Sequence, residues 1–87
     1  MPYIKQKDRN QFARVLSYLT RDILKIGVGE LNYLITMICK FYIHSNKERY
    51  QSYNDIVGAL ECCKLEMYRR SVSPYEDTKI KENGDVG

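Results

Sequence analysis

Apolar residues recur at helical spacing along three stretches of the chain, which is 87 residues long. The first stretch predicts a helix from Asp8 to the glycines at 27–29, with Asp8 as its N-cap and Gln11 completing a capping-box pattern. Its apolar face comprises Phe12, Val15, Leu16, Leu19, Ile23 and Ile26. Its opposite face carries a basic stripe, which comprises Lys7, Arg14, Arg21 and Lys25. The stripe is either an anion-binding surface or an ordinary solvated helix face.

The second stretch, Glu30–His44, is apolar around nearly its whole circumference. Its polar positions form only one narrow strip, which comprises Asn32, Thr36, Lys40 and His44. A helix this apolar is buried on more than one side, and two flanking helices of so short a chain cannot cover it fully. We therefore expect part of this helix, including Tyr33 and Met37, to contact another subunit.

The third stretch predicts a helix that begins at the Ser52-x-x-Asp55 signal and ends at Val72, because Pro74 bars its continuation. The expected core face comprises Tyr53, Ile56, Val57, Leu60, Cys63, Met67 and Tyr68. Outside that face, Gly58, Leu65 and Val72 repeat at every seventh position. A glycine there lets another backbone approach closely, so these three residues are candidates for an oligomer interface. Alternatively, the glycine only lowers helix propensity and the leucine is an ordinary exposed side chain.

The last segment, "PYEDTKIKENGDV", contains Asn83-Gly84 between short alternating stretches, which is a strong hairpin signal. An isolated hairpin of this size is marginal in water, so we expect it to dock on its own helices or on a neighbouring subunit. The pattern as a whole predicts an all-α protein: a three-helix domain over residues 1–73 and an irregular or hairpin tail over residues 74–87, assembled as a homo-oligomer.

Charge is distributed unevenly along the chain, although the net charge is only +3. Residues 1–50 carry nine Lys and Arg against four Asp and Glu, a balance of +5, whereas residues 51–87 carry five against seven, a balance of −2. This dipolar layout favours self-association or a basic face toward an anionic ligand. It is too weak to require nucleic acid as a partner.

The chain lacks the usual signals for disulfides, metal binding and membrane insertion. Its three cysteines, Cys39, Cys62 and Cys63, form no C-x-x-C pair, and His44 lies five residues from Cys39, on a different helix face. We expect reduced thiols, no metal and no cofactor. The amino terminus is polar rather than signal-like, and the run Leu31–Cys39 is far below the roughly 20 residues that span a bilayer. We therefore expect a cytoplasmic protein without a membrane partner.

Catalytic patterns are also missing from the sequence, which has one histidine, no G-x-S-x-G and no P-loop. Binding is therefore the expected class of function.

A group of tyrosines and basic residues near the carboxy terminus has the chemistry for binding. Tyrosine rings can stack on a nucleobase, and the basic side chains can bind a phosphate. The candidate ligand-binding residues are Tyr68, Arg69, Arg70, Tyr75, Lys79, Lys81 and Asn83. The alternative is that Arg70 pairs with Glu66, Arg69 complements the helix dipole and Tyr68 belongs to the core.

Four segments of the chain form a recognisable combination: the opening "MPYIKQKDR", then "GELNYLIT" and "VGALECCKLEMYRR", and the closing "PYEDTKIKENGDV". With these segments the chain resembles an uncharacterised family of small proteins encoded by bacteriophages and prophage-bearing bacteria. The resemblance implies a small phage-type protein. It carries no activity and assigns no functional residue.

Two hypotheses follow for the function. In the first, a non-enzymatic phage-type protein captures a small anionic, nucleotide-derived ligand at a subunit interface and acts as an anti-defence sponge. In the second, the basic stripe of the first helix binds a host or phage protein, or DNA. A structural role in the virion or its assembly stays open beside them.

Overall fold

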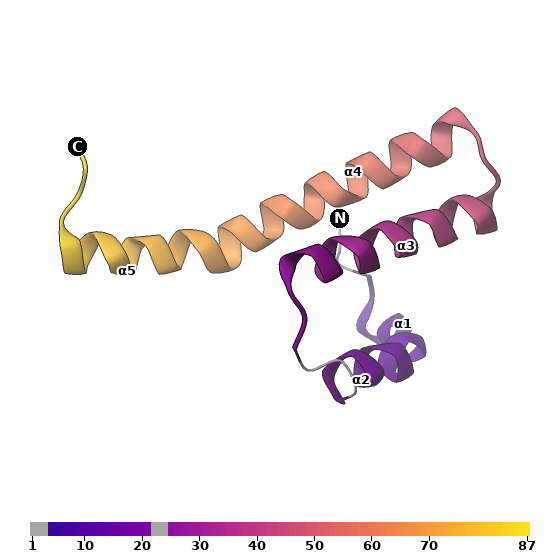
Figure 1. Cartoon of the computed structure of the whole chain (residues 1–87), viewed down its shortest axis with the longest axis horizontal. Coiled ribbons are helices and arrows are strands. Elements are labelled where there is room, and N and C mark those ends of the chain that lie inside the picture. Colours follow the sequence, from indigo (N-terminus) through magenta and orange to yellow (C-terminus); the bar gives the residue numbers. More distant parts are fainter. Residues whose placement is uncertain (1–3, 22–24) are drawn as a thin grey trace. The chain divides into compact units, whose positions relative to one another are not determined.

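The computed structural model describes residues 4–21 and 25–87, and all regular structure within these ranges is helical (Figure 1). The elements in chain order are α1 (Gln6–Arg9), the 3-10 turn η1 (Asn10–Phe12), α2 (Ala13–Arg21), α3 (Val28–Asn46), α4 (Tyr50–Met67), the π-helical turn η2 (Tyr68–Val72) and α5 (Ser73–Asn83). The predicted all-α class is confirmed. The chain divides into two compact units, Tyr3–Ile56 and residues 57–87, with the boundary inside α4.

The first predicted helix is interrupted and begins earlier than expected. α1 begins at Gln6, so Asp8 lies inside its single turn and does not cap it. Instead, Gln11 Nε2 donates a hydrogen bond of 2.9 Å to the backbone oxygen of Asp8. Lys25 lies in a non-helical segment, so it is not part of a continuous helical stripe. The predicted apolar position Ile23 lies outside the described residues.

The second predicted helix is confirmed and is slightly longer at both ends. α3 begins at Val28, and Glu30 Oε1 accepts a 2.8 Å hydrogen bond from the backbone N–H of Gly27, which satisfies one donor left open at the helix start. At the other end, Asn46 Nδ2 donates to the backbone oxygen of Tyr42 at 3.0 Å. The chain then turns at Lys47 toward α4.

The third predicted helix begins two residues early, at Tyr50, and the capping role expected of Ser52 is wrong. Ser52 lies within the helix, where its Oγ donates a 2.8 Å hydrogen bond back to the carbonyl oxygen of Lys47. This bond ties the first turn of α4 to Lys47, the residue that directly follows α3. The Ser52 side chain therefore stabilises the turn between α3 and α4 and does not cap the amino terminus of α4.

Pro74 does not stop the third helix, contrary to the sequence-based expectation. Figure 1 shows the helical ribbon continuing from α4 through η2 into α5. A proline inside an α-helix removes one N–H and its ring clashes with the carbonyl four residues earlier. Here the turn before the proline widens, because the N–H of Ser73 bonds to the Tyr68 oxygen five residues back. The wider π turn relieves that clash and allows the helix to continue.

The expected irregular or hairpin tail is also wrong, since residues 73–83 form α5. Gly84 adopts a φ of 88°, and its N–H donates a 2.8 Å hydrogen bond to the Ile80 oxygen. Glycine adopts this positive φ without the steric cost that a Cβ would bring, although its ψ of 148° differs from that of the common left-handed helical cap. The Asn83-Gly84 pair therefore ends a helix instead of turning a hairpin.

Hydrophobic side chains are poorly covered throughout the described part of the chain, where none is buried. On α3, Tyr33 is 63% exposed and Phe41 is 71% exposed. On α4, the expected core face does not form a core: Val57 is 66% exposed and Tyr53 is 44% exposed. The apolar faces predicted from the sequence exist, but a single chain leaves them open to solvent.

Candidate functional site

The residues predicted to bind a ligand all lie on the helical segment from η2 to α5, and we call them the carboxy-terminal cluster. Tyr68, Arg69 and Arg70 belong to η2, whereas Tyr75, Lys79, Lys81 and Asn83 belong to α5. At a rise of 1.5 Å per residue, the cluster extends over roughly 22 Å of helix. All seven side chains are exposed, and because consecutive residues such as Tyr68, Arg69 and Arg70 point in different directions around a helix, the cluster forms no pocket in the single chain.

Both arginines of the cluster contact one carboxylate. Arg69 Nη2 lies 3.2 Å from each oxygen of Glu66, and Arg70 Nε lies 3.0 Å from Glu66 Oε1. The alternative interpretation of Arg70, an i,i+4 ion pair, is thus present in the structure. Two guanidinium groups share a single acid, so this group of three side chains keeps a formal charge of +1.

The π turn changes which side chains face each other across the cluster. In a regular α-helix, Tyr68 and Tyr75 would share a face, because seven residues make almost two complete turns. The extra residue in η2 rotates α5 by about one position, so Tyr68 Oη instead donates a 3.2 Å hydrogen bond to Glu76 Oε1. The sequence alone does not indicate Glu76 as a partner.

The α5 part of the cluster pairs an aromatic ring with a cation. Lys79 Nζ lies 5.5 Å from the centroid of the Tyr75 ring and 3.3 Å from Glu82 Oε2. A cation at this distance from a ring is attracted to its face. Lys81 and Asn83 lie farther along the same helix and are exposed.

The basic stripe of the first helix is divided between two elements and a connection. Arg14 and Arg21 line a shallow hollow of about 470 Å³ on α2 together with Ala13, Ser17 and Tyr18. Within the described residues, neither arginine forms an ion pair. Lys7 lies on α1 and Lys25 lies beyond α2, so the structure does not bring all four basic residues onto one helical face.

The turn between α3 and α4 brings together a set of polar residues that the sequence reasoning missed. Tyr42 Oη donates a 3.1 Å hydrogen bond to Asp55 Oδ2, and Gln51 Nε2 donates to Asp55 Oδ1 at 2.7 Å. Tyr53 Oη donates a 2.5 Å hydrogen bond to Glu48 Oε2. These hydrogen bonds raise the pKa of Tyr42 and of Tyr53 above the ordinary 10.0, because each phenol donates to a carboxylate.

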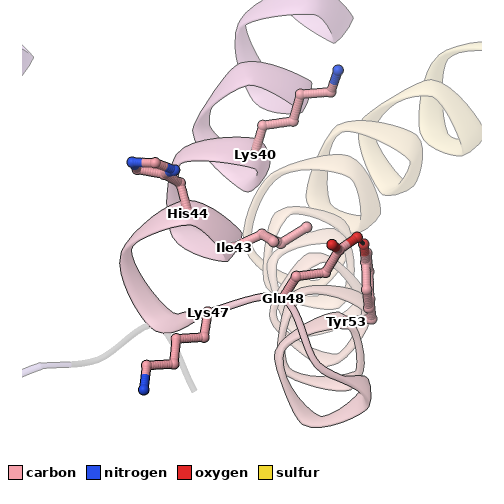
Figure 2. Close-up of a pocket in the computed structure, with 6 residues that line it drawn as sticks. All are labelled: Lys40, Ile43, His44, Lys47, Glu48 and Tyr53. Carbon is pink, nitrogen blue, oxygen red and sulfur yellow. Dashed lines mark hydrogen bonds between the residues drawn. The ribbon is translucent and has the colours of Figure 1, made fainter.

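Beside these bonds lies a hollow of about 480 Å³, which we call the basic hollow (Figure 2). Its lining residues are Lys40, Ile43, His44, Lys47, Glu48 and Tyr53. Figure 2 shows the Ile43 side chain pointing toward Glu48 and Tyr53, while the side chains of Lys40, His44 and Lys47 point away from these residues and in different directions. The hollow thus combines an apolar wall with a basic rim.

Alkaline pH is expected to loosen the α3–α4 turn. Because the folded-state pKa of Tyr42 and Tyr53 is raised above 10.0, their hydrogen bonds contribute fully below pH 10 and are lost as the pH rises through the folded values. In an ultraviolet titration of tyrosinate, Tyr42→Phe and Tyr53→Phe should each remove a late-titrating group. Tyr50→Phe is the matched control, since Tyr50 is 80% exposed. The same titration curve for all three variants would contradict this expectation.

Other chemistry is sparse in the part of the chain that the structure describes. Cys39 and Cys62 are half-buried, Cys63 is exposed, and all three are free thiols. Within residues 4–21 and 25–87, no three His, Cys, Asp or Glu residues are placed to hold a metal ion. The helices in these ranges are too short or too polar to cross a membrane.

Comparison with known proteins gives a family but no activity. No curated protein and no solved structure matches the chain. Residues 1–86 match the domain of unknown function DUF6899. Since this match covers almost the whole sequence, the chain belongs to the DUF6899 family of uncharacterised domains.

Proposed function

We propose that this chain is a non-enzymatic, phage-type binding protein that self-associates and captures a small anionic, nucleotide-derived ligand between its subunits. In this role it withdraws a signal molecule of host defence from solution. The observation that carries the proposal is that no hydrophobic side chain in the described residues is buried, although three helices present apolar faces. Uncovered apolar faces of this extent are typical of surfaces that contact another chain.

The residues predicted for the interface are available for such contacts. On α3, Tyr33 is 63% exposed and Met37 is 43% exposed. On α4, Leu65 is 57% exposed, and a Cβ added to Gly58 would have no neighbour within 4 Å. Full burial of a large apolar side chain contributes roughly 1.5–3 kcal/mol, so a few such residues per subunit are enough to stabilise an oligomer.

The carboxy-terminal cluster supplies the chemistry for the ligand. The Tyr75 ring can stack on a base, and the arginines on Glu66 can bind a phosphate bidentately. An exposed cluster that extends over about 22 Å of one helix does not enclose a ligand by itself. Two copies of the cluster, related by the symmetry of an oligomer, would enclose a ligand where their Tyr and Arg side chains meet.

Replacing Arg70 by alanine is expected to weaken ligand capture by about ten- to a hundredfold, since a charge-assisted hydrogen bond contributes about 1.5–3 kcal/mol. The measurement is the thermal shift of the protein with a panel of cyclic and linear nucleotides. Lys64→Ala is the matched control, because Lys64 pairs with Glu61 at 2.7 Å and is not part of the cluster. If no nucleotide raises the melting temperature of the unmodified protein, the proposed ligand class is wrong.

A second candidate function is binding of duplex DNA by the α2 surface. It is favoured by Arg14 and Arg21, which lie beside Tyr18 around one hollow and form no ion pair within the described residues. DNA affinity that falls steeply with salt, and that is lost when Lys7, Arg14 and Arg21 are changed to alanine, would identify this function instead.

A further inference from the structure

Helix α2 has an apolar face that the rest of the described chain leaves uncovered. Phe12, at the end of η1, is 44% exposed, and Val15 and Leu16 on α2 are 54% and 56% exposed. Leu19 is half-buried. These four residues follow the spacing i, i+3, i+4, i+7, so they lie on one side of the helix. Neither the proposed oligomer interface nor the carboxy-terminal cluster uses this face.

The opposite side of α2 is basic. At 100° per residue, Arg14 and Arg21 point in nearly the same direction, roughly 160° away from the centre of the apolar face. Both side chains are exposed, and within the described residues neither forms an ion pair. Tyr18 lies at the border between the two sides and is 56% exposed. A phenol suits such a border, because its ring is apolar and its hydroxyl is polar.

The charge of this segment has a single sign. Between Asp8 and Asp22 the sequence contains three arginines and no acid. A second copy of the same face would bring like charges together, which opposes its docking there. Duplex DNA would contact the arginines but would leave the apolar side in water. A partner that combines negative charge with a hydrocarbon interior fits both sides of the helix.

We propose that α2 is a docking surface for an anionic lipid bilayer. The helix would lie in the plane of the interface, with Val15 and Leu16 among the acyl chains. A helix whose apolar side is buried about 5–10 Å at this boundary keeps its other side among the headgroups, where Arg14 and Arg21 would contact lipid phosphates. The expected lack of a membrane partner rested on the absence of a spanning segment from the sequence, which surface binding does not require. The inference does not rest on the proposed function.

The test is co-sedimentation of the full chain with vesicles of two compositions, phosphatidylcholine alone and an equal mixture of phosphatidylcholine and phosphatidylserine. We expect binding to the mixed vesicles that weakens with salt, and binding to the neutral vesicles that is weaker by about tenfold or more. Val15→Ser should weaken binding to the mixed vesicles by about tenfold, because less apolar surface is buried. The double variant Arg14→Gln, Arg21→Gln should weaken it by about tenfold or more, because two phosphate contacts are lost.

Matched controls carry comparable changes outside α2. Val86→Ser changes an exposed valine in the tail, and Arg49→Gln combined with Lys64→Gln removes two exposed positive charges. Both controls should bind the mixed vesicles like the unmodified chain. Val15→Ser should keep the molar mass and the helical circular dichroism signal of the unmodified chain, which distinguishes a lipid surface from an oligomer contact.

Four results would overturn the inference. They are the absence of binding to the mixed vesicles, equal binding to the neutral vesicles, equal behaviour of Val15→Ser and Val86→Ser, and a changed molar mass of Val15→Ser. If duplex DNA binds the chain and the mixed vesicles do not, α2 belongs to the second candidate function instead.

Discussion

Replacing Met37 by glutamate is expected to convert the proposed oligomer into a monomer with reduced helical content. Met37 lies on α3 and is 43% exposed in the single chain. If a neighbouring subunit covers it, the substitution loses roughly 1.5–3 kcal/mol of apolar burial and places a charge in an apolar contact. The dissociation constant should then rise by about a hundredfold or more. Sedimentation equilibrium and circular dichroism on the same samples measure both effects.

The matched control for this change is Thr36→Glu, on the polar strip of the same helix. It introduces the same charge one residue away, at a position predicted to face solvent. Its mass and helical signal should stay close to those of the unmodified protein. If instead Met37→Glu keeps its mass and helicity, α3 does not form the interface.

Replacing Pro74 by alanine is expected to stabilise the helix from α4 to α5 by about 1–3 kcal/mol, because alanine restores the missing N–H and removes the ring. The π turn at Tyr68–Val72 would then give way to regular α-helix. This change from a π turn to α-helical turns would rotate Tyr68 away from Glu76. Their 3.2 Å hydrogen bond should therefore be lost as well. Urea unfolding followed by circular dichroism measures the change in stability.

Ser73→Ala serves as the neighbouring control, because it changes the same turn without affecting the ring. Its effect should stay within about 0.5 kcal/mol, as is usual for surface positions. A Pro74→Ala variant that is less stable than the unmodified protein would show that the π turn is stabilised by more than accommodation of the proline.

The existence of the helices could be predicted from the sequence because their apolar periodicity extends over many residues. The stop at Pro74 could not be predicted correctly, since the same residue either ends a helix or is tolerated after a π turn. Asn83-Gly84 was ambiguous for a similar reason. A glycine with positive φ serves both a hairpin turn and a helix C-terminal cap, and here Gly84 caps α5.

The candidate sites were predictable only where they depend on local spacing. The pair of Glu66 and Arg70 follows from their i,i+4 separation, and the structure contains it. The bond between Tyr42 and Asp55 joins residues on two helices across a turn, so no local pattern indicates it. Lys47 has a positive φ of 70°, and its carbonyl oxygen accepts a hydrogen bond from Ser52, for which the sequence had suggested a capping role.

The central claim is that this chain folds stably only when another copy covers its apolar helices. It is tested most directly by measuring molar mass by light scattering and helical content by circular dichroism across a dilution series of the unmodified protein. We predict an oligomer at high concentration, with mass and helical signal falling together on dilution. A monomer that keeps its full helical signal at every concentration would contradict the claim.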